Sequence, residues 1–88
     1  MANFMGGSAP AMAAQIENGF ILVSSATLRG YSVADLQNLR MELDKLLRAT
    51  RAEVPPADDA LAQAARNRRI SRLSSSLQVI GAQITTSR

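Results

Sequence analysis

Two adjacent prolines, Pro55 and Pro56, separate two segments in which apolar residues recur at helical spacing. Proline lacks an amide hydrogen and disfavours a helical conformation in the residue before it, so no helix runs through this pair. The two apolar stripes are Leu36, Leu39, Leu43 and Leu46 in the first segment, and Ile70, Leu73, Leu77, Ile80 and Ile84 in the second. Steps of three and four place each stripe on one helix face. The sequence therefore predicts a mainly α fold, an antiparallel helical hairpin with helices over about 32–53 and 58–84.

The helix starts carry recognisable signals. Ser32 and Asp35 have the spacing of a capping box, in which each side chain bonds the backbone N–H of the other residue. Tyr31, just before this cap, is positioned to contact Leu36 one turn later. Asp58 is the expected cap of the second helix. These signals fix the predicted starts of both helices within the sequence.

The first third of the chain has weaker signals. Residues 1–15 are rich in glycine and alanine, and they predict a flexible N-terminal arm before a single small helical domain over 16–88. A short helix is possible after Pro10, with Asn18-Gly19 ending it. The stretch GFILVSS combines strand-favouring residues with flanking Gly and Ser, which predicts one or two short strands over about 20–29. Such a hairpin is unstable alone and needs a helix or another chain to cover it.

The composition indicates that the monomer core is thin. Of the 88 residues 47% are hydrophobic, but only 3% are aromatic and many of the rest are alanine, which buries little area. There is no cysteine and no histidine, so disulfides and ordinary zinc sites are excluded as stabilising elements. Contact with other chains is the remaining way to stabilise so thin a core. We therefore expect a homo-oligomer that also contacts other structural proteins. The predicted interface consists of Phe20, Ile21, Leu22, Val23, Leu36, Leu39, Leu43, Leu46, Ile70, Leu73, Leu77 and Ile80.

Four arginines within seven positions form the main charged feature of a chain whose net charge is +3: Arg66, Arg68, Arg69 and Arg72. Three interpretations stay open. The side chains are solvated or lay their stems over the apolar stripe, they pair with acids of the same or a neighbouring subunit, or they contact phosphates. A nucleic-acid-binding module usually shows more bases or interleaved aromatic residues, so nucleic acid is a possible but not the favoured partner.

The residues needed for catalysis are missing. The absence of histidine removes the commonest general base, and no phosphate-loop motif is present. We therefore expect a protein that is not an enzyme and has no cofactor, metal or small-molecule substrate. The N-terminus lacks the basic and apolar regions of a signal peptide, and no apolar run is long enough to span a membrane. The expected location is a virion or a cytoplasmic assembly.

Residues 11–47 (AMAAQIENGFILVSSATLRGYSVADLQNLRMELDKLL) resemble the small head–tail joining proteins of tailed bacteriophages, the lambda gpW type. These proteins have a short helix, a β-hairpin and then a helix with a Ser-x-x-Asp-Leu start, and YSVADLQNLRMEL is the most similar part. The resemblance implies a virion component that forms a ring between portal and tail, with basic residues facing a DNA channel. Only Ser32, Asp35 and Leu36 carry over, and their role is structural. The long second helix departs from the short basic tail of that family.

The chain also resembles type III secretion needle subunits, which are short helical hairpins with a turn similar to VPPADDAL. The strand-like FILVSS and the polar end TTSR depart from that family. The favoured prediction is a non-enzymatic structural or assembly protein, a small head–tail, neck or tail component of a tailed bacteriophage. The alternatives are a helical filament subunit of the secretion-needle type and a small nucleic-acid-binding regulator that uses Arg66, Arg68, Arg69 and Arg72.

Overall fold

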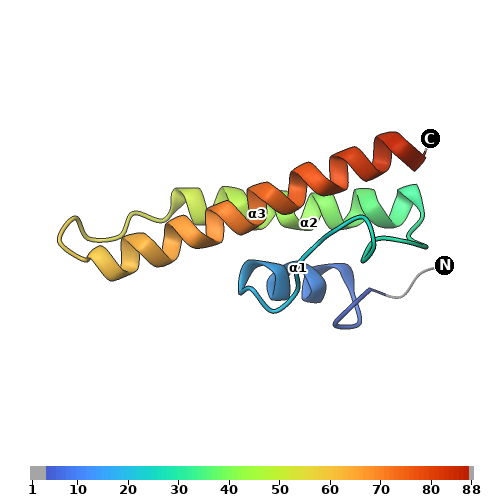
Figure 1. Ribbon diagram of the computed structural model, residues 1–88. Coiled ribbons are helices and arrows are strands. Elements are labelled where there is room, and N and C mark those ends of the chain that lie inside the picture. Colours follow the sequence, from blue (N-terminus) through green and yellow to red (C-terminus); the bar gives the residue numbers. More distant parts are fainter. Residues whose placement is uncertain (1–3, 88) are drawn as a thin grey trace.

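Three helices account for most of the chain in the computed structural model, which describes residues 4–87. They are α1 (Ala9–Glu17), α2 (Val33–Ala52) and α3 (Ala60–Ser87). The prediction of a mainly helical protein is confirmed. Helices α2 and α3 lie side by side and run in opposite directions, and α1 packs beside them near the end where α2 begins (Figure 1). The molecule is elongated, with extents of 46 × 24 × 19 Å.

Helix α2 begins at the predicted capping box. Ser32 Oγ accepts a hydrogen bond from the Asp35 backbone N–H at 3.0 Å, and Asp35 Oδ2 accepts one from the Ser32 N–H at 3.1 Å. At α3 the cap differs by one residue, because Asp59 rather than Asp58 accepts from the Ala62 N–H, at 2.9 Å. The side chain of Asp58 therefore stays at the exposed surface.

Helix α1 occupies much of the segment predicted to be a flexible arm. Ser8 caps it by accepting from the Ala11 N–H at 3.2 Å, and Pro10 lies in its first turn. Proline is well tolerated there because the amide that it lacks has no intrahelical acceptor. Met12 and Ile16 are buried in the core. Residues 9–15 thus belong to the helical body, and residues 1–3 of the predicted arm lie outside the described residues.

The predicted strands over 20–29 are wrong, since this segment consists of turns and irregular backbone and the described residues contain no strand. The Ser24 and Thr27 side chains take up the local backbone groups. Ser24 N–H donates to Thr27 Oγ1 at 2.8 Å, and the Thr27 hydroxyl donates to the Ser24 carbonyl at 2.9 Å. Among residues 4–87, no neighbouring strand competes for these groups. The segment instead lies on the helices through buried Val23 and Leu28.

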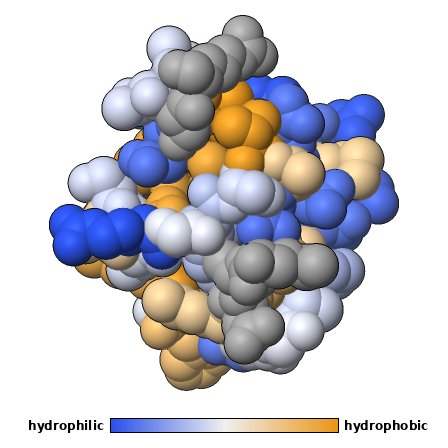
Figure 2. All heavy atoms as spheres, turned by 90° about the vertical axis from the view of Figure 1, so that its right-hand side faces the viewer, coloured by the Kyte–Doolittle hydropathy of each residue, from blue (hydrophilic) through white to orange (hydrophobic). Residues whose placement is uncertain are grey.

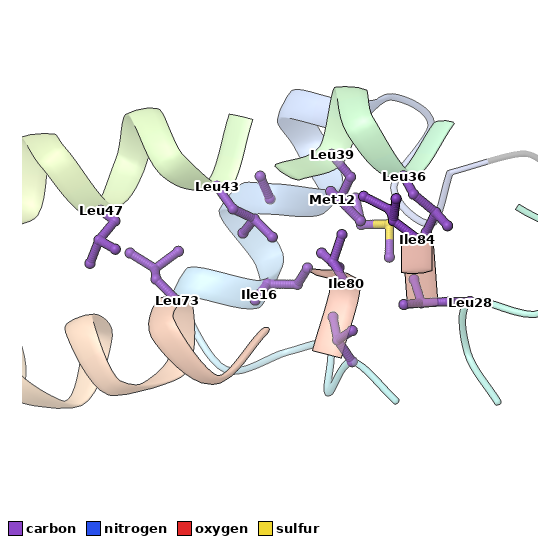
Figure 3. Packing of buried hydrophobic residues seen from close by; sticks show 12 residues of the cluster. Met12, Ile16, Leu28, Leu36, Leu39, Leu43, Leu47, Leu73, Ile80 and Ile84 are labelled. Carbon is purple, nitrogen blue, oxygen red and sulfur yellow. The ribbon is translucent and has the colours of Figure 1, made fainter. Parts of the chain in front are cut away.

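The core lies where the three helices and the 20–29 segment meet. In Figure 3, Leu47 of α2 and Leu73 of α3 point toward one another, and Ile16 of α1 lies near Ile80 of α3. The core residues are Met12, Ala13, Ile16, Val23, Leu28, Leu36, Leu39, Leu43, Leu47, Leu73, Ile80 and Ile84. Leu47 completes the α2 stripe at its C-terminal end, where the sequence predicted Leu46, which is only half-buried.

Candidate functional site

The arginine cluster was the strongest charged candidate, and two of its four members, Arg66 and Arg72, bond to the carbonyls of helix ends. Arg72 Nη1 donates to the carbonyl of Glu17, the last residue of α1, at 3.1 Å. The guanidinium lies against Gly19, whose positive φ of +82° turns the chain away from α1. A Cβ atom added to Gly19 would lie only 3.1 Å from Arg72 Cζ. Arg72 therefore caps the negative end of α1 from a different helix.

Arg66 plays the same role for α2. Its Nε donates to the Thr50 carbonyl at 3.1 Å and its Nη2 donates to the Arg51 carbonyl at 2.9 Å. Both carbonyls belong to the last turn of α2, where the i+4 donors of a continuing helix are missing, although the Thr50 carbonyl also accepts from the Glu53 N–H at 3.2 Å. A cation at this end also interacts favourably with the helix dipole. Arg66 thus binds the C-terminal end of α2 to the first half of α3.

The remaining two arginines differ from each other. Arg69 Nη2 forms an ion pair with Glu53 Oε2 at 2.6 Å, just beyond the end of α2. Arg68 is exposed and makes no hydrogen bond or ion pair within the part of the chain that the structure describes. Of the three interpretations, pairing with an acid of the same chain describes Arg69, and solvation describes Arg68. Arg66 and Arg72 instead bond to helix carbonyls, which none of the three interpretations included. Arg68 is the member of the cluster whose guanidinium has no partner among the described residues.

A polar contact joins α1 to α2 close to these caps. The Thr50 hydroxyl donates to Glu17 Oε2 at 3.1 Å, and Thr50 is only 3% exposed. Glu17 accepts from Arg72 through its backbone carbonyl and from Thr50 through its carboxylate. Thr50 in turn accepts from Arg66. The ends of α1 and α2 and the middle of α3 are thereby connected in one hydrogen-bonded group.

Most residues of the predicted interface lie inside the single chain. A fully buried side chain is not available to a second chain, so the fully buried members of the two stripes belong to the core of the single chain. The buried members are Val23, Leu36, Leu39, Leu43, Leu73 and Ile80, and the half-buried members are Ile21, Leu46, Ile70 and Leu77. Only Phe20 and Leu22 are exposed, at 80% and 87%. The structure brings the stripes together but leaves these two side chains in solvent.

A shallow groove of about 260 Å³ is lined in part by Leu22, and Phe20 lies in the chain between two other lining residues, Gly19 and Ile21. We call it the α3 groove. One wall is formed by the loop residues Ile21, Leu22 and Val23, and the other by Ser71, Ser75 and Val79 of α3. The groove is mostly apolar, and none of the described residues that line it is acidic. Its shape and chemistry fit an apolar side chain rather than a charged ligand.

A second group of exposed residues lies at the other end of α3. The connection between α2 and α3 and the start of α3, residues 53–61, form the tip opposite the two termini (Figure 1), which we call the loop end. Val54 and Leu61 are 90% and 84% exposed there. The sequence carried a signal for Leu61: it precedes Ile70 by nine residues, or 2.5 turns, which places it opposite the buried stripe. For Val54 there was no such signal.

The end of the molecule where α2 begins and α3 ends has a mixed surface. Figure 2 shows hydrophobic residues that reach this surface between hydrophilic ones. Among residues 4–87, no three acidic side chains come together in a way that would hold a metal ion. The described helices include none that is both long and apolar enough to cross a membrane. No protein-family model, curated protein or solved structure matches the chain.

Proposed function

We propose that the protein is a non-enzymatic structural subunit that assembles with copies of itself and with other proteins of the same particle. The observation that carries this proposal is the exposure of four large apolar side chains at two sites. Leu22 lines the α3 groove and Phe20 lies two positions before it in the same loop, while Val54 and Leu61 lie at the loop end. Scattered single apolar residues are normal on a surface, whereas these are each at least 80% exposed in a chain of 88 residues. Contact with another chain would remove them from water.

The setting proposed from the sequence is the neck or tail of a bacteriophage particle. The α1 helix and the Ser32–Asp35 start of α2 agree with the order of elements in head–tail joining proteins. The absence of a β-hairpin from residues 20–29 departs from that order. It also removes one objection to the filament-subunit alternative, which needs two antiparallel helices joined by a Pro/Asp turn. Both settings require the same property, repeated contacts between subunits.

The nucleic-acid-binding alternative has less support. Arg66, Arg69 and Arg72 already bond to carbonyls or to Glu53 within the chain, so phosphate binding would have to replace these contacts. Arg68 alone is too little charge for the electrostatic binding on which such proteins depend. We therefore put forward assembly as the single function of this protein.

The test is the solution mass of nuclease-treated protein, measured by light scattering after size exclusion at low and high salt. We expect a defined oligomer that survives high salt, because apolar contacts are not screened by ions. Changing both Phe20 and Leu22 to serine should reduce the mass. The matched control is Met41→Ser on α2, where the side chain is 50% exposed and far along the chain from both sites. A wild-type chain that stays monomeric even at millimolar concentration would overturn the proposal.

A further inference from the structure

We propose that copies of the chain join head to tail, with the loop end of one copy docked in the α3 groove of the next. This inference rests on the proposed self-assembly and names its contact surfaces. Leu61 and Val54 are the apolar residues offered by the loop end, and Ile21, Leu22 and Val79 are the apolar residues that receive them. Each surface alone leaves large apolar side chains in water, and together they would remove them from it.

Charge identifies a second copy of this chain as the occupant. Around Leu61 the loop end carries the exposed carboxylates of Asp58 and Asp59, whereas Glu53, beside Val54, is already paired with Arg69. The α3 groove is lined by Arg72 and no acid, and the unpaired Arg68 precedes it by one turn on the exposed side of α3. An acidic apolar end therefore meets a basic apolar groove. Such complementarity guides association and fixes which surfaces meet, while apolar burial supplies the affinity.

A loop end is unable to reach the groove of its own chain. Leu61 and Ser75 lie on the same continuous helix, and fourteen residues at 1.5 Å each hold them about 21 Å apart. The helix is straight through this stretch in Figure 1, so no hinge brings the two together. The contact has to form between two molecules.

The position of Arg68 favours a head-to-tail contact over a two-fold dimer. Leu61, Arg68 and Ser75 recur every seven residues, which keeps them within about 40° of one another on a single face of α3. If two antiparallel copies placed each Leu61 opposite the other's Ser75, the axis would pass by residue 68, midway between them. The two exposed Arg68 side chains would then meet, and like charges at an interface are unfavourable. A head-to-tail contact avoids this clash and leaves a free loop end and a free groove on every growing assembly.

Such a contact propagates from copy to copy. If the rotation between neighbours closes, the product is a ring, and if it does not, the product is a helical filament. Either product contains more than two copies. The number of copies thus separates this arrangement from a two-fold dimer.

The experiment uses one variant of each surface. Leu61→Gln removes the apolar group of the loop end, and Ser75→Trp fills the α3 groove. Both residues are exposed, so the fold should be retained, and circular dichroism should show wild-type helix content. Met41→Gln and Gln78→Trp are the controls, as they introduce the same two residues, glutamine and tryptophan, at exposed positions outside both surfaces. Light scattering should give an oligomer larger than a dimer for wild type and controls, and a monomer for each of the two variants alone.

Mixing the two variants is the decisive step. The Leu61→Gln chain keeps its groove and the Ser75→Trp chain keeps its loop end, so an equimolar mixture should form a one-to-one dimer and stop there. A wild-type oligomer whose mass is unchanged by both variants would overturn this interface and leave the proposed function standing. So would a mixture that stays monomeric, or a wild-type protein that is only a dimer. A wild-type monomer would overturn both proposals.

Discussion

Arg72 and Glu17 are joined across 55 positions of the sequence by a hydrogen bond of 3.1 Å from the guanidinium to a backbone carbonyl. The bond crosses from α3 to the last residue of α1, where helix carbonyls have no donor of their own. The charged donor strengthens it relative to a neutral one. A residue of the basic cluster therefore serves to hold α1 against the other two helices.

Replacing Arg72 with methionine should test this role, because methionine keeps most of the apolar stem and removes every donor. We expect the free energy of unfolding to fall by about 1.5 to 3 kcal/mol, the usual net contribution of a hydrogen bond to a charged group. Urea unfolding followed by circular dichroism measures the change. Arg40→Met is the control, since Arg40 is exposed on α2, and it should change stability by less than about 0.5 kcal/mol. Equal effects of the two changes would show that the Arg72 cap contributes nothing.

The contact between Thr50 and Glu17 should appear as a coupling energy. Thr50→Val and Glu17→Ala each remove one partner of the hydrogen bond, so the double variant should lose about 1 kcal/mol less than the sum of the single losses. Unfolding curves of the four proteins give this quantity. Thr50→Val combined with Glu42→Ala should be additive, because Glu42 pairs with Lys45 and not with Thr50. Additive losses at Thr50 and Glu17 would mean that the contact does not form in solution.

Leu43 should behave as a core residue and not as an interface residue. Its side chain is fully buried, so Leu43→Ala should cost about 2 to 5 kcal/mol through lost burial and the cavity left behind. For a small domain that is a large part of the total stability. Met41→Ala, two residues away and half exposed, should cost much less. The decrease in the free energy of unfolding caused by Leu43→Ala should be the same at low and high protein concentration. A decrease that disappears on dilution would show that Leu43 lies in a subunit interface.

Arg66 should affect stability rather than nucleic-acid binding. Arg66→Met removes two hydrogen bonds to the end of α2, and we expect a loss of about 1 to 2 kcal/mol in the free energy of unfolding. The affinity of the wild-type protein and of the variant for a DNA duplex is titrated at several salt concentrations, below the unfolding temperature. We expect the salt dependence of any affinity to be the same for both proteins. If Arg66 instead neutralised a phosphate, the log–log slope would become shallower by about 0.9. That result would favour the nucleic-acid-binding alternative.

Local signals predicted much of this fold. The Ser32–Asp35 box, the prolines and the repeated Leu and Ile residues depend on interactions within a few positions, and α2 and α3 begin and end within about three residues of their predicted bounds. The strand prediction failed for a related reason. Strand-favouring residues describe a side-chain preference, but a strand forms only when a neighbouring strand accepts its backbone bonds. Here the Phe20 and Ile21 N–H groups donate to the Gln15 carbonyl, and the Ser24 and Thr27 side chains bond each other's backbone groups.

Much less of the candidate site than of the fold could be predicted from the sequence. Periodicity showed that Leu39 and Ile80 each belong to an apolar face, but it did not show whether that face meets the same chain or another. The structure answers this, because α2 and α3 close on each other and leave Phe20, Leu22, Val54 and Leu61 outside. The exposure of Leu61 could be predicted from its position around the helix axis. The exposure of Phe20 could not, because it depends on how its loop crosses α3.

The sequence by itself determined that the chain is mainly helical, the bounds of its two long helices to within about three residues, and which face of each is apolar. These properties follow from local hydrogen bonding, capping and the 3.6-residue period. Only the tertiary structure decided what the arginines do, because the carbonyls that Arg66 and Arg72 cap lie 15 to 55 positions away in the chain. Such contacts arise when the helices pack, and no pattern within one segment encodes the partner on another.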